Sequence, residues 1–155
     1  MNIETQKELL DLLITAEARC EALYGRFADS MAEHRGLWTR MAGEEKRHAA
    51  VLKALRGKIA AGEASFGQGE LRAEAMRMFL DYVDAMAKEV SGGRMTPERA
   101  LGITVDIERS YVERKVLDHF EGDTPAVAEA LKVLRDESFR HVADAELAWL
   151  AARRA

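Results

Sequence analysis

The stretch Met41-Ala-Gly-Glu-Glu-Lys-Arg-His48-Ala-Ala-Val-Leu52 places a carboxylate and an imidazole inside the apolar stripe of a helix. Apolar residues recur every three or four positions from Met41 to Ile59, and Glu45 and His48 lie within the same stripe. Helical residues three apart project from one side, about 60° apart and about 4.5 Å along the axis. Burying such groups is costly unless they are paired, hydrogen-bonded or bound to a metal. Partners for this pair are therefore sought on the other helices.

Length and composition are those of one globular domain spanning residues 1–155. The formal net charge is −4, and acidic and basic residues are mixed along the chain, which predicts no nucleic-acid partner. Cys20 is the only cysteine, so neither an intrachain disulfide nor a CxxC metal pair is expected. No apolar run approaches the roughly 20 residues of a membrane span, and the charged N-terminus lacks a signal-peptide core. The expected location is the cytoplasm.

Helical patterns fill the chain and strand alternation is absent, which predicts an all-α protein. Both prolines are expected to start helices, because Thr96-Pro97 and Thr124-Pro125 place a capping hydroxyl before a proline at the first helical position. The glycine-rich segment 62–69 is expected to form a loop. The expected helices run from about Glu4 to Ser30, Glu33 to Ala61, Glu70 to Val90, Pro97 to Phe120, and Pro125 to near the C-terminus.

The order and length of these helices predict a particular architecture. Four of them form two antiparallel hairpins, and the crossover between the hairpins contains its own helix. This arrangement is a four-helix bundle with the one-crossover topology of ferritin-like proteins. The crossover helix carries Met76, Phe79 and Tyr82, which are the expected contact in a homodimer.

Polar residues interrupt the apolar stripes of the other long helices as well. Glu17 interrupts the stripe of the first helix, and Glu108 interrupts that of the fourth. The last helix carries Glu137 and His141 within its stripe. Glu17 lies 28 residues before Glu45, and Glu108 lies 29 residues before Glu137, so the two hairpins repeat one layout. The repeat is expected to bring four carboxylates and two imidazoles to the middle of the bundle.

This combination of residue types predicts a metal centre. One glutamate from each of two helices, plus a Glu/His pair from each of the other two, is the ligand set of di-iron carboxylate bundles. Four glutamates would balance two divalent ions, whereas without metal such carboxylates partly protonate or need basic partners. Mixed oxygen and imidazole ligands suit iron or manganese, and also zinc. The predicted ligands are Glu17, Glu45, His48, Glu108, Glu137 and His141.

Three segments carry a resemblance to a known family: Ala16-Glu-Ala-Arg-Cys-Glu-Ala-Leu-Tyr24, Glu44-Glu-Lys-Arg-His48-Ala, and Met95-Thr-Pro-Glu-Arg-Ala-Leu-Gly-Ile-Thr-Val-Asp-Ile-Glu-Arg-Ser110. Together they resemble the first, second and third bundle helices of the rubrerythrin-like branch of the ferritin-like superfamily. The resemblance implies two iron ions that react with dioxygen or peroxide. It also implies that Glu45 bridges the ions, that a histidine caps each ion, and that the catalytic Tyr24 hydrogen-bonds a carboxylate.

The last helix departs from the family pattern. Aligning His48 with His141 places Ser138 where the family has its second Glu-x-x-His glutamate, and Glu137 stands one residue earlier. Residues four apart still share a helix face, about 40° and 6 Å apart, so Glu137 is expected to reach the site in a shifted geometry. An inward Lys115 would replace metal charge with a salt bridge. The second ion is therefore predicted to bind more weakly than the first.

Two functions of different kinds follow from these observations. The first is a di-iron oxidoreductase or iron-handling protein, of peroxidase or ferroxidase type, whose electrons come from an unidentified partner because the chain has no CxxC module. The second is a degenerate bundle with one metal ion or none, acting as a binding or assembly module, which Ser138 and Lys115 favour. Outside the site, Cys20 is expected to be a small buried residue and Glu44 to lie on a solvated face.

Overall fold

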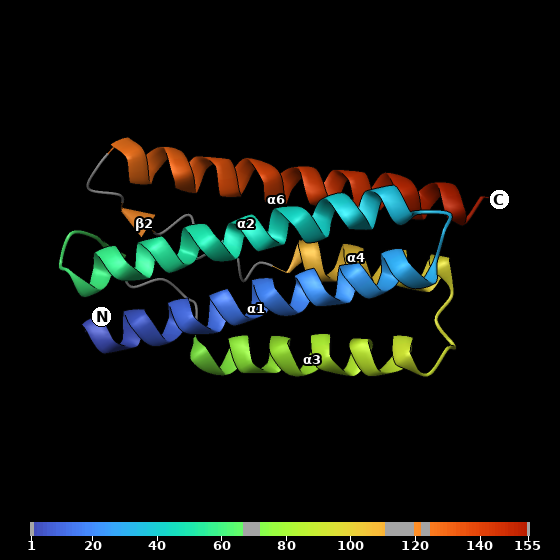
Figure 1. Ribbon diagram of the computed structural model, residues 1–155, viewed down its shortest axis with the longest axis horizontal. Coiled ribbons are helices and arrows are strands. Elements are labelled where there is room, and N and C mark those ends of the chain that lie inside the picture. The colour runs from blue at the N-terminus through green and yellow to red at the C-terminus, as the bar shows by residue number, and fades with distance from the viewer. Residues whose placement is uncertain (1, 67–71, 111–119, 122–124, 155) are drawn as a thin grey trace.

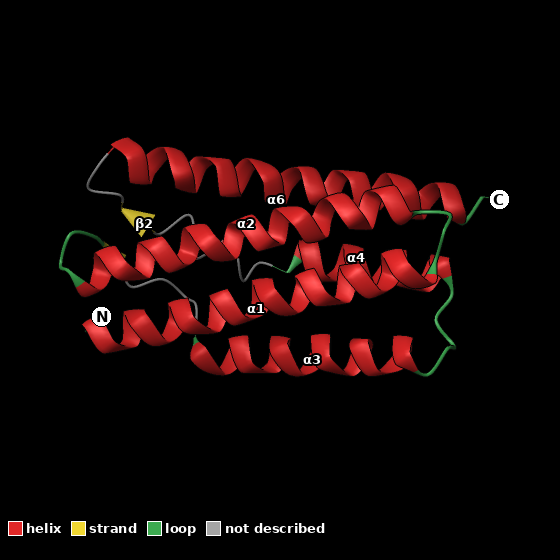
Figure 2. Cartoon of the chain, in the orientation of Figure 1, coloured by secondary structure: helices red, strands yellow, loops and turns green. Residues whose placement is uncertain are grey.

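Helix dominates the part of the chain that the computed structural model describes, namely residues 2–66, 72–110, 120–121 and 125–154. The helices in chain order are α1 Ile3–Ser30, α2 Arg35–Ala60, α3 Ala73–Ser91, α4 Pro97–Arg109 and α6 Pro125–Ala152. Two strands of two residues each, β1 Ser65–Phe66 and β2 Phe120–Glu121, complete the described elements, and Figure 2 shows β2 as a short arrow. The prediction of an all-α protein is confirmed.

The helices run side by side along the length of the molecule (Figure 1). α1 and α2 form an antiparallel hairpin, α3 packs along α1, and α4 packs against α6. α6 also meets α2, which brings the second and last helices together. In the described part of the chain, no helix has both the length and the apolar character that a membrane crossing requires.

Two clusters of buried apolar side chains lie along the bundle. One cluster includes Leu52 and comes from α1, α2, α3 and α6, with Ala64 just after α2. The other includes Trp38 and comes from α1 to α4, with Met31 just after α1. Along α1, Leu13 belongs to the first cluster and Cys20 to the second. Glu17 lies between them, so the polar positions of the stripes fall where the two apolar clusters meet.

The helix ends follow local rules that the sequence makes visible. Asn2 caps α1, because its Oδ1 accepts a hydrogen bond from a backbone N–H of the first turn at 2.8 Å. Thr96 caps α4 in the same way at 3.2 Å, with Pro97 as the first helical residue. Gly62 and Gly93 follow α2 and α3 with φ of 73° and 71°, a left-handed conformation that glycine adopts without strain.

The fourth helix is shorter than predicted. Its apolar pattern predicts helix as far as Phe120, whereas α4 ends at Arg109. Ser110 leaves the helical conformation with ψ of 125°, although its N–H still donates to two carbonyl oxygens of the last turn. The predicted roles of Lys115 and Thr124 concern residues that lie outside the described part of the chain.

The second difference is the pair of short strands. β1 lies within the segment 62–69 that the sequence predicts as loop, and β2 holds the predicted end of the fourth helix. The two strands pair antiparallel, with Ser65 opposite Glu121 and Phe66 opposite Phe120. Because this pairing joins segments far apart in the chain, local periodicity does not report it.

Most of the large apolar residues of α3 face the body of the protein. Met76 is fully buried, and Phe79 and Tyr82 are partly buried against the core. These side chains contact the core of their own chain, and the predicted dimer contact stays a prediction. The exposed apolar residue of α3 is Met78, with 68 % of its surface accessible.

A buried hydrogen-bond chain links α2 to α4 and gives a stability prediction. The indole Nε1 of Trp38 donates to Oγ1 of Thr104 at 3.1 Å, and that hydroxyl donates to the carbonyl oxygen of Ala100 at 2.8 Å. Thr104→Val is expected to lower the free energy of unfolding by about 1–3 kcal/mol, because the buried indole N–H loses its acceptor. Urea unfolding measures this, and Thr104→Ser, which keeps the hydroxyl, serves as control. Unchanged stability of Thr104→Val would show that the hydrogen bond from Trp38 does not contribute.

Candidate metal centre

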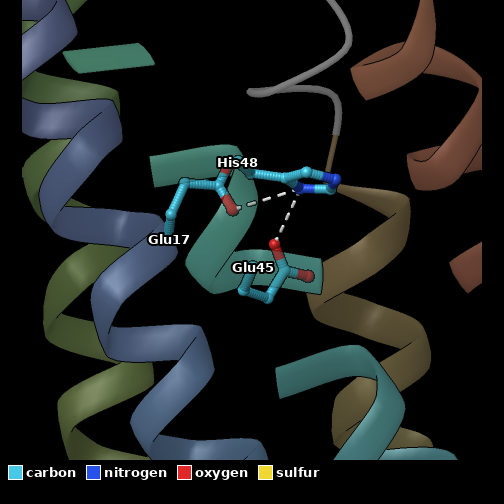
Figure 3. Close-up of side chains that lie close together, drawn as sticks. All are labelled: Glu17, Glu45 and His48. Carbon is cyan, nitrogen blue, oxygen red and sulfur yellow. Dashed lines mark hydrogen bonds and ion pairs between the residues drawn. The ribbon is translucent and has the colours of Figure 1, made fainter. Parts of the chain in front are cut away.

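The first group of converging side chains joins α1 to α2. Glu17 comes from α1, and Glu45 and His48 come from successive turns of α2 (Figure 3). Nδ1 of His48 lies 3.0 Å from Oε2 of Glu45 and 3.6 Å from Oε2 of Glu17. All three side chains are buried. The predicted association of the α2 pair with Glu17 is therefore found in the structure.

The second group adds α4 and α6 and shares one residue with the first. Nδ1 of His141 lies 3.1 Å from Oε1 of Glu45 and 3.3 Å from Oε2 of Glu108. In each group, one ligand-type atom from every residue lies within 4.8 Å of the others. Glu45 turns Oε2 toward His48 and Oε1 toward His141. The two groups therefore meet at a single shared carboxylate.

The donor set fits divalent cations. Three carboxylates and two imidazole nitrogens converge in a buried space, and this mixture of oxygen and nitrogen suits iron, manganese or zinc. Within the described part of the chain, Nδ1 of His141 is buried and makes no hydrogen bond of good geometry, although two carboxylate oxygens lie close to it. A nitrogen that faces two carboxylates in this way is placed as a metal ligand would be. The two imidazole rings are stacked, with centroids 5.7 Å apart.

The inner carboxylates have opposite pKa shifts. Burial opposes ionisation of Glu45, but its contacts with Glu17, His141 and His48 outweigh burial and lower the pKa of Glu45. Burial and the nearby charge of Glu45 raise the pKa of Glu108, against the influence of His141. Glu45 is therefore held as an anion more strongly than Glu108.

His141 supplies the compensating positive charge in the metal-free protein. Burial opposes its ionisation, but the carboxylates of Glu108 and Glu45 outweigh it and raise the pKa of His141 from 6.5 to about 11. Since the folded pKa lies above the ordinary value, this charge stabilises the metal-free fold below about pH 6.5. That contribution is lost as the pH rises toward about 11.

Metal binding at the second group is expected to release the proton of His141. The apparent affinity for an added divalent ion should therefore rise with pH, by up to about tenfold per pH unit for one proton displaced. Zn²⁺ titrations against a chromophoric chelator at three pH values between neutrality and the His141 pKa of about 11 measure the slope. His141→Gln should flatten it, whereas His34→Gln, at the start of α2, should leave it unchanged. An affinity independent of pH would contradict the assignment of this proton.

Tyr24 lies beside the second group. Its hydroxyl donates to Oε1 of Glu108 at 2.5 Å, and the side chain is fully buried. Burial and the charge of Glu108 raise the pKa of Tyr24 well above its ordinary value, so the phenol stays protonated. The hydrogen bond from Tyr24 to a site carboxylate, which the family resemblance implies, is present. It orients Glu108 so that the other oxygen faces His141.

Glu137 occupies a different position from the one predicted. Its Oε2 lies 2.9 Å from Nε2 of His48, which is the outer ring nitrogen and not the one that faces Glu45. In the described part of the chain, Glu137 belongs to neither group of potential ligands. Ser138 is buried, and its hydroxyl donates to the carbonyl oxygen of Leu134 at 3.0 Å. Three glutamates, not four, therefore face the centre.

Glu44 is the site residue that the sequence interpretation missed. It is predicted to lie on a solvated face, but only 6 % of its surface is accessible. Its Oε2 lies 2.5 Å from Nε2 of His141, and its Oε1 lies 2.7 Å from Nη2 of Arg140. The contacts with His141 and Arg140 lower the pKa of Glu44 although burial opposes this. The sequence does contain a signal for Glu44, because aligning His48 with His141 also aligns Glu44 with Glu137.

A small cavity lies against the inner carboxylates. It has a volume of about 20 Å³, which is room for a species the size of one water molecule. Glu17, Glu45 and Glu108 form its polar wall, and Cys20 and Phe79 belong to the remainder of its lining. The prediction that Cys20 is buried is confirmed. A small molecule in this cavity would meet the carboxylates of both groups.

The structure thus brings five of the six predicted ligands together: Glu17, Glu45, His48, Glu108 and His141. It places the sixth, Glu137, against the outer side of a histidine. No family model, curated protein or solved structure matches this chain.

Proposed function

We propose that this protein is a di-metal carboxylate protein of the rubrerythrin-like type, which holds iron and either oxidises it or reacts with dioxygen or peroxide. The observation that carries the proposal is Glu45, a buried carboxylate whose two oxygens serve two separate Glu/His groups. A carboxylate in this position would be shared by the two groups if each held a cation. Structural ion pairs seldom bury three carboxylates between two imidazoles, since the desolvation cost is high.

The roles of the individual side chains follow from their contacts. Glu17 and His48 would hold one ion, and Glu108 and His141 would hold the other, with Glu45 common to both. A pair of ferrous ions would supply electrons to a small oxidant. The 20 Å³ cavity beside the carboxylates marks where a small oxidant would approach, and it excludes larger molecules. Tyr24 would keep Glu108 oriented and could exchange a proton with it.

Three inner glutamates leave the charge of two divalent ions incompletely balanced. The carboxylates carry −3 when ionised, against +4 for two ions, so a small anion in the cavity would complete the balance. The single Cys20 provides no two-cysteine electron-transfer module, and electrons for a catalytic cycle would come from a separate donor. Iron oxidation would need no such donor.

Two observations favour a second candidate, a binding or assembly module with one ion or none. Ser138 supplies no carboxylate to the second group. His141, with its pKa raised to about 11, is a cation among the carboxylates and can stand in for a metal. In this alternative the polar centre would serve to fix how the helices pack.

Metal analysis separates the two candidates. The protein should be purified without a polyhistidine tag, loaded anaerobically with Fe²⁺, desalted, and assayed for metal per chain. The proposal expects at least one tightly held ion and consumption of dioxygen or peroxide by the loaded protein. Absence of retained iron, manganese and zinc would replace the oxidoreductase proposal with the binding module.

A further inference from the structure

The second and last helices carry the same five-residue pattern, Glu-x-x-Arg-His. It reads Glu44-Glu-Lys-Arg47-His48 on α2 and Glu137-Ser-Phe-Arg140-His141 on α6. In both copies the glutamate stands four residues before the histidine, so the two share a helix face. The structure shows that each glutamate binds the Arg-His pair of the opposite helix.

The contacts of Glu44 form one half of this arrangement. Its Oε2 accepts from Nε2 of His141 at 2.5 Å, and its Oε1 accepts from Nη2 of Arg140 at 2.7 Å. Each oxygen thus has its own donor on α6, and the carboxylate cannot rotate without losing one of them. Arg40 adds a longer ion pair to Oε2 at 3.7 Å, and Arg47 adds one to Oε1 at the same distance.

The contacts of Glu137 form the other half, in the reverse direction. Its Oε2 lies 2.9 Å from Nε2 of His48, and its Oε1 lies 3.3 Å from Nη2 of Arg47. The two halves are therefore related by an approximate two-fold exchange of α2 and α6. The contacts of Glu137 are longer than those of Glu44. The Glu137 side chain is also more exposed, with 16 % of its surface accessible against 7 % for Glu44.

These crosswise contacts set the orientation of the two histidine rings. In both histidines, Nε2 faces the glutamate of the opposite helix, which is Glu137 for His48 and Glu44 for His141. Nδ1 of each ring faces the inner carboxylates. A carboxylate that accepts the Nε2 proton leaves Nδ1 free to act as a ligand and makes it a stronger one. An arginine that holds the second oxygen keeps the carboxylate, and hence the imidazole ring, in one orientation.

We propose that Glu44 and Glu137 are positioning residues, each of which fixes the histidine of the opposite helix with Nδ1 directed at the inner carboxylates. This inference rests on the proposed metal function for its purpose. It assigns Glu44 to the group formed by Glu45, Glu108 and His141, and Glu137 to the group formed by Glu17, Glu45 and His48. The dependence is crosswise, so a change on α2 acts on the histidine of α6, and the reverse.

The isosteric variants Glu44→Gln and Glu137→Gln test the proposal. A glutamine has one acceptor oxygen, so it can serve the histidine or the arginine but not both, while the side-chain volume stays the same. Glu146→Gln is the matched control, because it is the same substitution on α6 and removes the charge from the 2.7 Å ion pair with Arg109, with no histidine contact among the described interactions.

Zn²⁺ is the probe for affinity, and long-range ¹H–¹⁵N spectra of the histidine side chains report the ring nitrogens. Each Glu→Gln variant is expected to weaken Zn²⁺ binding by about 10- to 100-fold, and the control is expected to leave it within twofold. In the metal-free protein, Glu44→Gln should shift the ¹⁵N signals of His141 and spare His48. Glu137→Gln should do the opposite.

Two results would overturn the proposal. One is a shift confined to the histidine on the same helix as the substitution, or no shift at all. The other is a crosswise shift in the metal-free spectra with Zn²⁺ affinity within twofold of the wild type, which would limit the contacts to holding the helices together. If the wild type binds no Zn²⁺, the proposed metal function fails. In that case the metal-free spectra alone decide whether the glutamates fix the rings.

Discussion

Glu45→Ala is expected to abolish binding of both metal ions, whereas loss of Glu17 or Glu108 should remove only one. The reason is the shared position of Glu45, with one oxygen 3.0 Å from the ring of His48 and the other 3.1 Å from the ring of His141. Its removal takes one ligand from each three-residue group at the same time. A group reduced to two protein ligands loses most of its affinity, because binding depends on ligand number and geometry.

Metal per chain after anaerobic Fe²⁺ loading measures this effect, with far-ultraviolet circular dichroism as a check on folding. Glu17→Ala and Glu108→Ala are the matched controls, because each removes one buried carboxylate of the same size from only one group. Glu45→Gln keeps the side-chain shape, so a loss of metal in this variant cannot be caused by lost packing. Retention of one full ion by Glu45→Ala would show that the two groups do not share a bridging ligand.

The inward stripes of the first hairpin could be predicted because they depend on local periodicity. Glu17 and Tyr24 on α1, like Glu45 and His48 on α2, lie on helix faces otherwise made of large apolar residues, and all are buried. A polar residue within such a face must be buried when the face packs. The ligand-type residues of the first hairpin could therefore be recognised before any contact was known.

The outer contacts could not be predicted from periodicity alone. Glu44 lies about 100° around the helix from Glu45, a direction that a single helix gives no reason to bury. It is buried because α6 passes close to α2 and presents His141 and Arg140 to it. The end of α4 at Arg109 was missed as well, because the sequence pattern predicts helix beyond that residue.

The second large effect is expected at Ser138. Wild-type protein is predicted to retain fewer than two ions per chain after Fe²⁺ loading, and Ser138→Glu is predicted to raise the content toward two. Ser138 stands three residues before His141, as Glu45 stands before His48, and it is almost fully buried. A glutamate there would complete a second Glu-x-x-His pair and bring the inner charge to −4, which balances two divalent ions.

Ser138→Gln is the control, because it adds the same bulk without the charge. Both substitutions press a larger side chain into a packed position, which typically costs about 1–3 kcal/mol. Only the glutamate variant should recover stability when metal is added, because its buried charge then acquires a partner. Thermal unfolding with and without Fe²⁺, alongside metal content, therefore separates ligand gain from overpacking.

Glu137→Ala distinguishes between two roles of Glu137, a metal ligand and a residue that positions His48. If Glu137 were the ligand that replaces the missing glutamate, its loss would remove the ion held by Glu108 and His141, and Ser138→Glu would change nothing. The structure instead places Glu137 on the outer nitrogen of His48, so its loss should weaken the ion held by Glu17 and His48. Selective loss of the His141 ion in Glu137→Ala, with unchanged metal content in Ser138→Glu, would show that Glu137 already serves as the sixth ligand. If neither the wild type nor Ser138→Glu retains metal, the polar centre is vestigial and the protein acts as a binding module.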